Sequence, residues 1–158
     1  KDFEPIKSFY LKDELNPEIW NNFKIDEEIR EKLLKIAYDY VEHLDIDIEV
    51  EDIILTGSLS NFNYSKYSDF DIHVLFDFSK INEDEVLVKK YLDSAGRLWN
   101  NQHDISISGY EVELYSQNIS ETHISTGQYS LLNSKWIKKP SKENFVPDEE
   151  LIKKYLSF

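Results

Sequence analysis

Two apolar segments that flank a short polar stretch place the strongest constraint on how this chain folds. The first, "IILTG", is rich in branched residues and stops at Gly57, as a buried strand does. The second, "DFDIHVLF", alternates polar and apolar residues with the period of a strand that has one face in the core. Two neighbouring strands joined by the polar segment 58–68 are therefore expected at the centre of the fold.

Helical periodicity is found on both sides of this pair of segments. Asp26 is placed to cap a helix that continues to about Leu44, because apolar residues recur there at helical spacing. Asn82 and Glu85 resemble a capping pair for a second helix, which is expected to end near Asn101. The alternation predicts an α/β or α+β fold with a small mixed β-sheet, of three or four strands, flanked by helices.

The rest of the chain leaves more than one arrangement open. "DISISGYEVELYS" fits two short strands around Gly109, or one strand with a bulge at that glycine. Residues 126–147 are expected to be loop-rich, and residues 149–156 to form a closing helix. We predict one domain over residues 1–158, with an N-terminal helical segment 1–50, a core 51–118 and a C-terminal loop and helix 119–158.

Composition limits the classes of protein and of partner. The chain has 158 residues, of which 41% are hydrophobic and 31% charged, a globular balance that argues against disorder. The absence of Cys excludes a disulfide framework, a thiolate metal site and a Cys nucleophile. No apolar run approaches a membrane span and no secretion signal is visible, so a soluble, cytoplasmic protein without a membrane partner is expected.

The net charge of −13 argues against long duplex nucleic acid as a partner, because binding to a duplex depends on neutralising phosphates. Lysines in residues 89–90, 135–142 and 153–154 leave two interpretations open. They form a local basic patch, or they are scattered solvated lysines on an acidic surface.

Asp69 and Asp71 share one face of the second predicted strand with His73, whereas Phe70 and Ile72 point to the opposite face. Two carboxylates this close repel each other, and burying them together is unfavourable unless a cation lies between them. Mg²⁺ prefers hard oxygen ligands and is commonly held by one or two carboxylates together with substrate phosphates. The pair is therefore expected to hold a divalent metal.

Gly57 and Ser58 follow the first predicted strand. A glycine there lets the backbone turn sharply and approach a ligand closely. Ser58 would open a short helix or turn whose free N–H groups and hydroxyl can hold a phosphate. Each of these features alone also suits an ordinary turn, but a strand, Gly-Ser, a polar spacer and a strand with Asp-x-Asp form a more specific combination.

The stretch "TGSLSNFNYSKYSDFDIHV" resembles the signature of the nucleotidyltransferase superfamily, whose catalytic domain is the DNA polymerase β-like palm. The matched stretch covers about Ile53 to Leu75, and the order of helices and strands around it agrees. The chain is similar to small, stand-alone members of bacterial or phage origin, with residues 51–118 as catalytic core. The resemblance implies transfer of a nucleoside monophosphate from a nucleoside triphosphate to a hydroxyl acceptor, with release of pyrophosphate.

The resemblance also implies a third carboxylate on a later strand. Glu113 is the expected residue because its neighbours are apolar, and Glu111 is the reserve. Asp69 and Asp71 would hold one Mg²⁺ or Mn²⁺ with the nucleotide. All three carboxylates would hold a second ion that activates the acceptor hydroxyl.

Other roles follow from the same resemblance. Gly57 and Ser58 would hold the β- or γ-phosphate, and Lys66 either reaches the phosphates or faces solvent. His73 is a base, a partner of the metal ligands or a hydrogen-bonded structural histidine. The acceptor would be a small molecule, a protein side chain or an RNA end.

Two other functions stay open. A catalytically inactive nucleotide-binding or regulatory module would keep the fold, and a Ca²⁺ site for stability would keep the acids but leave Gly-Ser unexplained. The discriminating observation is whether Glu113 or Glu111 lies within metal reach of Asp71. Tyr129, Ser130 and Trp136 could stack on a base or shape an acceptor pocket, and ordinary core packing explains them as well.

Overall fold

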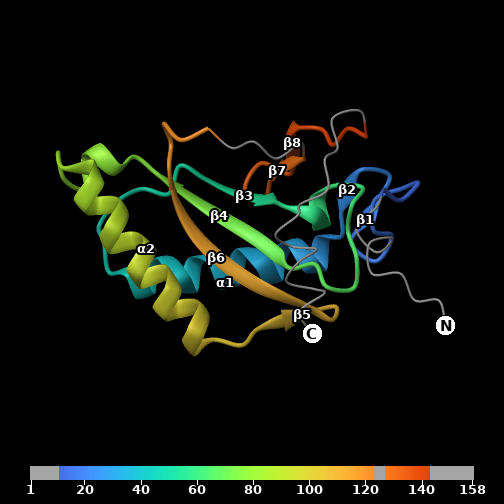
Figure 1. Ribbon diagram of the computed structural model, residues 1–158, viewed down its shortest axis with the longest axis horizontal. Coiled ribbons are helices and arrows are strands. Elements are labelled where there is room, and N and C mark those ends of the chain that lie inside the picture. Colours follow the sequence, from blue (N-terminus) through green and yellow to red (C-terminus); the bar gives the residue numbers. More distant parts are fainter. Residues whose placement is uncertain (1–10, 123–126, 143–158) are drawn as a thin grey trace.

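The computed structural model describes residues 11–122 and 127–142. Its centre is a six-stranded mixed sheet with the strand order β5-β6-β4-β3-β7-β8 (Figure 1). The strands are β3 (Asp52–Thr56), β4 (Phe70–Phe76), β5 (Ser106–Ile107), β6 (Tyr110–Asn118), β7 (Gln128–Ser130) and β8 (Lys135–Lys138). A separate two-stranded sheet pairs β1 (Trp20–Asn21) with β2 (Lys24–Ile25). This is the mixed α and β fold that the sequence predicts.

The two α-helices have the predicted extent, but one of them has a different cap. The helices are α1 (Glu27–Leu44), α2 (Glu85–Gln102) and the short 3₁₀ helices η2 (Ser58–Ser60) and η3 (Phe78–Lys80). As predicted, Asp26 caps α1, and its carboxylate accepts from the Ile29 N–H at 3.0 Å. The cap of α2 is Asp84, which accepts from the Leu87 N–H at 3.1 Å. The prediction of Asn82 as cap is wrong, because its side chain instead accepts from the Asp84 N–H at 2.8 Å and orders the preceding turn.

One face of the sheet carries the hydrophobic core. In β4 the alternating side chains that are fully buried are those of Phe70, Ile72, Val74 and Phe76. Helices α1 and α2 pack against this face (Figure 1), where Tyr40 of α1 and Ser116 of β6 share a hydrogen bond of 2.7 Å. The half-buried side chains of Asp71 and His73 point to the other face, as the period of the strand predicts.

The sheet has more strands than the three or four predicted. β5 and β6 form a hairpin around Gly109, which has φ +85°, so the interpretation as two short strands is confirmed. β7 and β8 lie in residues 126–147, which were wrongly predicted to be loop-rich, and β1 and β2 lie in the N-terminal segment that was predicted to be helical. These strands have two to four residues, too few for a period of two to show. The predicted closing helix 149–156 lies outside the described residues.

Helix α2 lies close to the open edge of β6. Because β5 pairs only with the start of β6, the backbone of Leu114 faces this edge without a neighbouring strand. The Asn100 side chain takes the place of one, since it donates to Leu114 O and accepts from Leu114 N, both at 3.0 Å. Gly96 permits the approach, because a Cβ there would lie 3.2 Å from the Tyr40 hydroxyl and 3.8 Å from Leu114 O.

Among the helices of the described ranges, none combines the length and the apolar character needed to cross a membrane.

Candidate metal centre

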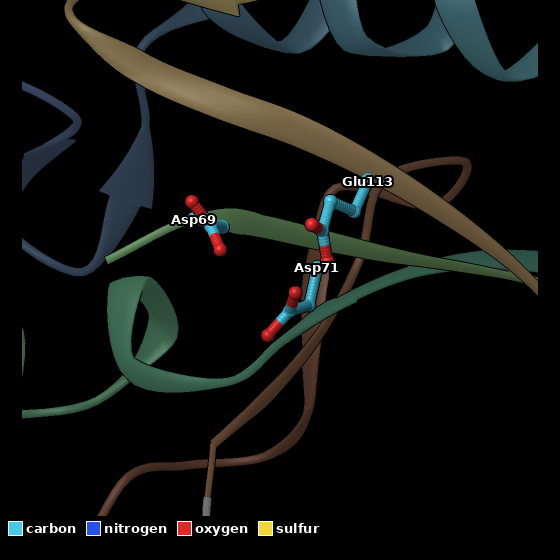
Figure 2. A group of neighbouring side chains, drawn as sticks. All are labelled: Asp69, Asp71 and Glu113. Carbon is cyan, nitrogen blue, oxygen red and sulfur yellow. The ribbon is translucent and has the colours of Figure 1, made fainter. Parts of the chain in front are cut away.

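The register of the sheet brings together carboxylates that lie far apart in the sequence. Asp71 of β4 is opposite Glu113 of the parallel neighbour β6, so both side chains leave the same face. Asp69 directly precedes β4. Oxygens of the three carboxylates lie within 4.8 Å of one another, and Figure 2 shows them gathered where β4 begins. The reserve residue, Glu111, is exposed and lies outside this group. We call Asp69, Asp71 and Glu113 the carboxylate triad.

The electrostatics of the triad are unfavourable without a cation. Withdrawal from water, followed by the charges of Glu113 and Asp69, raises the pKa of Asp71 from 3.8 to about 7. Within the described residues no Lys or Arg forms an ion pair with Asp71. A divalent cation between the carboxylates would remove this repulsion.

A buried hydroxyl provides a second, independent sign of a ligand. Thr56 is opposite Asp71 in the antiparallel β3–β4 pair, so its side chain lies on the face of the triad. The residue is 2% exposed, and Oγ1 has no hydrogen-bond partner in the part of the chain that the structure describes. Buried hydroxyls are normally satisfied, because an unmet group costs about 1–3 kcal/mol. An unmet oxygen opposite Asp71, on the face of the triad, fits a hard, hydrated cation such as Mg²⁺ or Mn²⁺.

Gly57 brings the end of β3 directly against the triad. Its φ is +83°, and a Cβ there would collide with Oδ2 of Asp71. The Gly57 carbonyl accepts from Ser60 Oγ at 2.9 Å and from Asn61 Nδ2 at 2.6 Å, and these bonds hold the turn. The predicted short helix begins at Ser58 as η2. The predicted close approach of the backbone is therefore present, and its neighbour is a triad carboxylate.

Ser58 and Lys66 lie on the polar segment between β3 and β4. The Ser58 hydroxyl shares a hydrogen bond of 2.5 Å with that of Ser68, which links the two ends of the segment next to Asp69. Lys66 is exposed, and its Nζ lies 5.1 Å from the centre of the Tyr67 ring. The phosphate-binding roles of both residues stay predictions.

Tyr115 is a neighbour of the triad that the sequence patterns did not single out. Its hydroxyl donates to Glu113 Oε2 at 2.5 Å, and its ring centre is 5.1 Å from that of His73. Burial, then this hydrogen bond, raises the pKa of Tyr115, so the phenol is a neutral donor. The period of β6 places Tyr115 on the face of Glu113, and that period could have identified it.

The late aromatic residues belong to the core. Tyr129 lies edge-on to Trp20 with ring centres 5.0 Å apart, and Trp136 stacks on Trp20 at 4.7 Å. Tyr129 is opposite Leu55, whose side chain is buried on the face away from the triad. These rings are therefore not placed to stack on a base at the triad.

Comparison with models of known protein families, with curated proteins and with solved structures finds no match for this chain. A functional interpretation therefore depends on the residues and their geometry.

Proposed function

We propose that the protein is a metal-dependent nucleotidyltransferase, which transfers a nucleoside monophosphate from a nucleoside triphosphate to a hydroxyl acceptor. The observation that carries this proposal is the carboxylate triad, assembled from two parallel strands beside the turn at Gly57. Two further observations support a cation there, namely the raised pKa of Asp71 and the unmet hydroxyl of Thr56. Phosphoryl transfer needs such a concentration of positive charge between acids and phosphates.

The triad would hold two ions of Mg²⁺ or Mn²⁺. These ions would neutralise the triphosphate and lower the pKa of the acceptor hydroxyl. The chain itself positions the triphosphate and the metal ligands. Gly57 and Ser58 place a tight turn against Asp71, where the triphosphate would bind. Tyr115 donates to one oxygen of Glu113, which fixes the carboxylate and leaves its other oxygen for a cation.

The geometry supports this proposal over the two alternatives. A third carboxylate too far from Asp71 to share a metal ion would favour an inactive module. Glu113 instead lies close enough to Asp69 and Asp71 for all three carboxylates to hold one ion. A purely structural Ca²⁺ site would need roughly six to eight oxygen ligands, and it would not explain the tight turn at Gly57.

Calorimetric titration of ATP, GTP, CTP and UTP with Mg²⁺ tests the proposal. We expect the wild-type chain to bind at least one nucleotide and Asp71→Asn to bind none. Glu111→Gln is the matched control, because it removes an exposed carboxylate from the same strand as Glu113 and is expected to bind like the wild type. A well-folded wild-type chain that binds no nucleotide would contradict the proposal.

A further inference from the structure

A cleft of about 630 Å³ lies between α2 and the open edge of β6. Small-molecule sites commonly have volumes of roughly 300–1,000 Å³. Most of the residues that line this cleft are polar or charged, and they come from β4, α2, β6 and the segment after β6. The residues without a polar side chain are Leu92, Gly96 and Leu114. A lining of this kind suits a polar or charged small molecule, whose groups can form hydrogen bonds there, better than an apolar one.

None of the three triad residues lines the cleft, but two of its lining residues are direct neighbours of the triad. His73 and Tyr115 line the cleft, and they are opposite each other in the β4–β6 pair, one step along the strand face from Asp71 and Glu113. The Tyr115 hydroxyl is 2.5 Å from Glu113 Oε2. The Tyr115 end of the cleft is therefore next to the third carboxylate.

The flank on α2 provides a guanidinium that has no carboxylate partner among the described residues. Arg97 lines the cleft and is exposed, and its side chain donates to Ser94 Oγ at 3.2 Å. No ion pair of Arg97 occurs within residues 11–122 and 127–142. The other cation of the cleft, Lys89, is neutralised by Glu121 at 3.2 Å and Asp93 at 3.6 Å.

The other arginine of the chain, Arg30, has a structural role. Arg30 donates to Leu131 O at 2.6 Å and Leu132 O at 3.2 Å, and it pairs with Glu27 at 3.1 Å. Arg97 has none of these structural roles. A guanidinium binds carboxylate and phosphate groups in two-point geometry, so Arg97 is available for an anionic ligand.

On the basis of the proposed function, we infer that this cleft is the acceptor site and that the acceptor is a small hydroxylated molecule carrying a phosphate or carboxylate group. Arg97 binds the anionic group, and the hydroxyl lies at the Tyr115 end beside Glu113. The hydroxyl oxygen forms a bond to the α-phosphorus while the bond from that phosphorus to the oxygen bridging to the β-phosphate breaks. Pyrophosphate leaves, and the hydroxyl proton passes to water.

The test measures binding of two probes, glycerol 3-phosphate and glycerate, by calorimetry in EDTA without nucleotide. We expect one of them to bind the wild-type chain, and the difference between them tells a phosphate site from a carboxylate site. Arg97→Gln should weaken this binding at least tenfold, by the ordinary strength of a charge-assisted hydrogen bond. Lys90→Gln is the matched control, since it removes an exposed charge from the same helix outside the cleft and should bind like the wild type.

Three outcomes would overturn the inference: neither probe binds, Arg97→Gln binds like Lys90→Gln, or binding is lost in Ser58→Ala instead. The last outcome would place the anion in the turn at Ser58. The variant Asp71→Asn separates the two proposals, because it should no longer bind the nucleotide with Mg²⁺ but should still bind the probe. If the wild-type chain binds a probe through Arg97 but binds no nucleotide, the proposed transferase function is wrong. The anion site at Arg97 then stands without an acceptor role.

Discussion

Gly57 and Asp71 approach each other so closely that only a hydrogen atom fits as the side chain of residue 57. A Cβ there would collide with Asp71 Oδ2, and the φ of +83° is itself unfavourable for other residues. The turn after β3 and the carboxylate on β4 are therefore positioned by one contact, which makes the glycine part of the candidate site.

Substitution Gly57→Ala is expected to destabilise the fold by about 1–3 kcal/mol through backbone strain alone. It should also weaken Mg²⁺ binding, because the new methyl group displaces the Asp71 carboxylate. Chemical denaturation and a metal titration measure the two effects. Gly109→Ala is the control, since Gly109 has φ +85° but no atom within 4 Å of a new Cβ. Equal metal affinity in the two variants would show that the collision has no effect on the site.

The pH dependence of stability has a sign that follows from Asp71. Its pKa is about 7 in the fold against an ordinary 3.8, so between these values the folded chain binds more protons than the unfolded chain. The free energy of unfolding of the metal-free protein therefore falls as the pH rises across this window, and it levels off above about pH 7. Thermal unfolding in EDTA from about pH 4 to about pH 8 should show a smaller fall for Asp71→Asn than for the wild type. Parallel curves would contradict the assignment.

Mg²⁺ or Mn²⁺ is expected to stabilise the folded chain, and more strongly at about pH 8 than at about pH 5, because protons compete for Asp71. A ligand at a hundred times its dissociation constant adds about 2.7 kcal/mol to the free energy of unfolding. Thermal unfolding with and without the metal measures this. The increase should vanish in Asp71→Asn and persist in Glu111→Gln, and an equal increase in both variants would assign the effect to metal binding elsewhere.

Tyr115→Phe is expected to leave the fold intact and to lower the affinity for metal about tenfold, since second partners of metal ligands typically have effects of 10–100-fold. The variant removes the hydroxyl that donates to Glu113 Oε2 and keeps the ring against His73. Tyr38→Phe, which removes an exposed hydroxyl from α1, is the control in the same Mn²⁺ titration. Unchanged affinity in Tyr115→Phe would mean that Glu113 needs no such support.

The centre of the fold followed from the sequence because β4 has a strict period of two over seven residues. That period placed Asp69 and Asp71 on one face. The choice of Glu113 over Glu111 came from its apolar neighbours, and the parallel register with β4 brings that residue opposite Asp71.

What the sequence did not predict depends on pairings between strands. Only the register of β3 against β4 brings Thr56 to the triad. Tyr115 shares the face of Glu113 through the period of β6, and the register of β6 against β4 places it opposite His73. The short strands β7 and β8 pair through tertiary contacts and carry too few residues for a pattern. The cleft beside Arg97 depends on how closely α2 approaches β6, which Asn100 and Gly96 decide.

The most direct test of the central claim is a crystal structure of the wild-type chain with Mn²⁺ and a non-hydrolysable nucleoside triphosphate. Anomalous scattering from the manganese locates each ion without assumptions about the site. We predict manganese bound by carboxylate oxygens of Asp69, Asp71 and Glu113, with the triphosphate against the turn at Gly57. A nucleotide bound elsewhere, or manganese that does not contact Asp71, would contradict the proposed function.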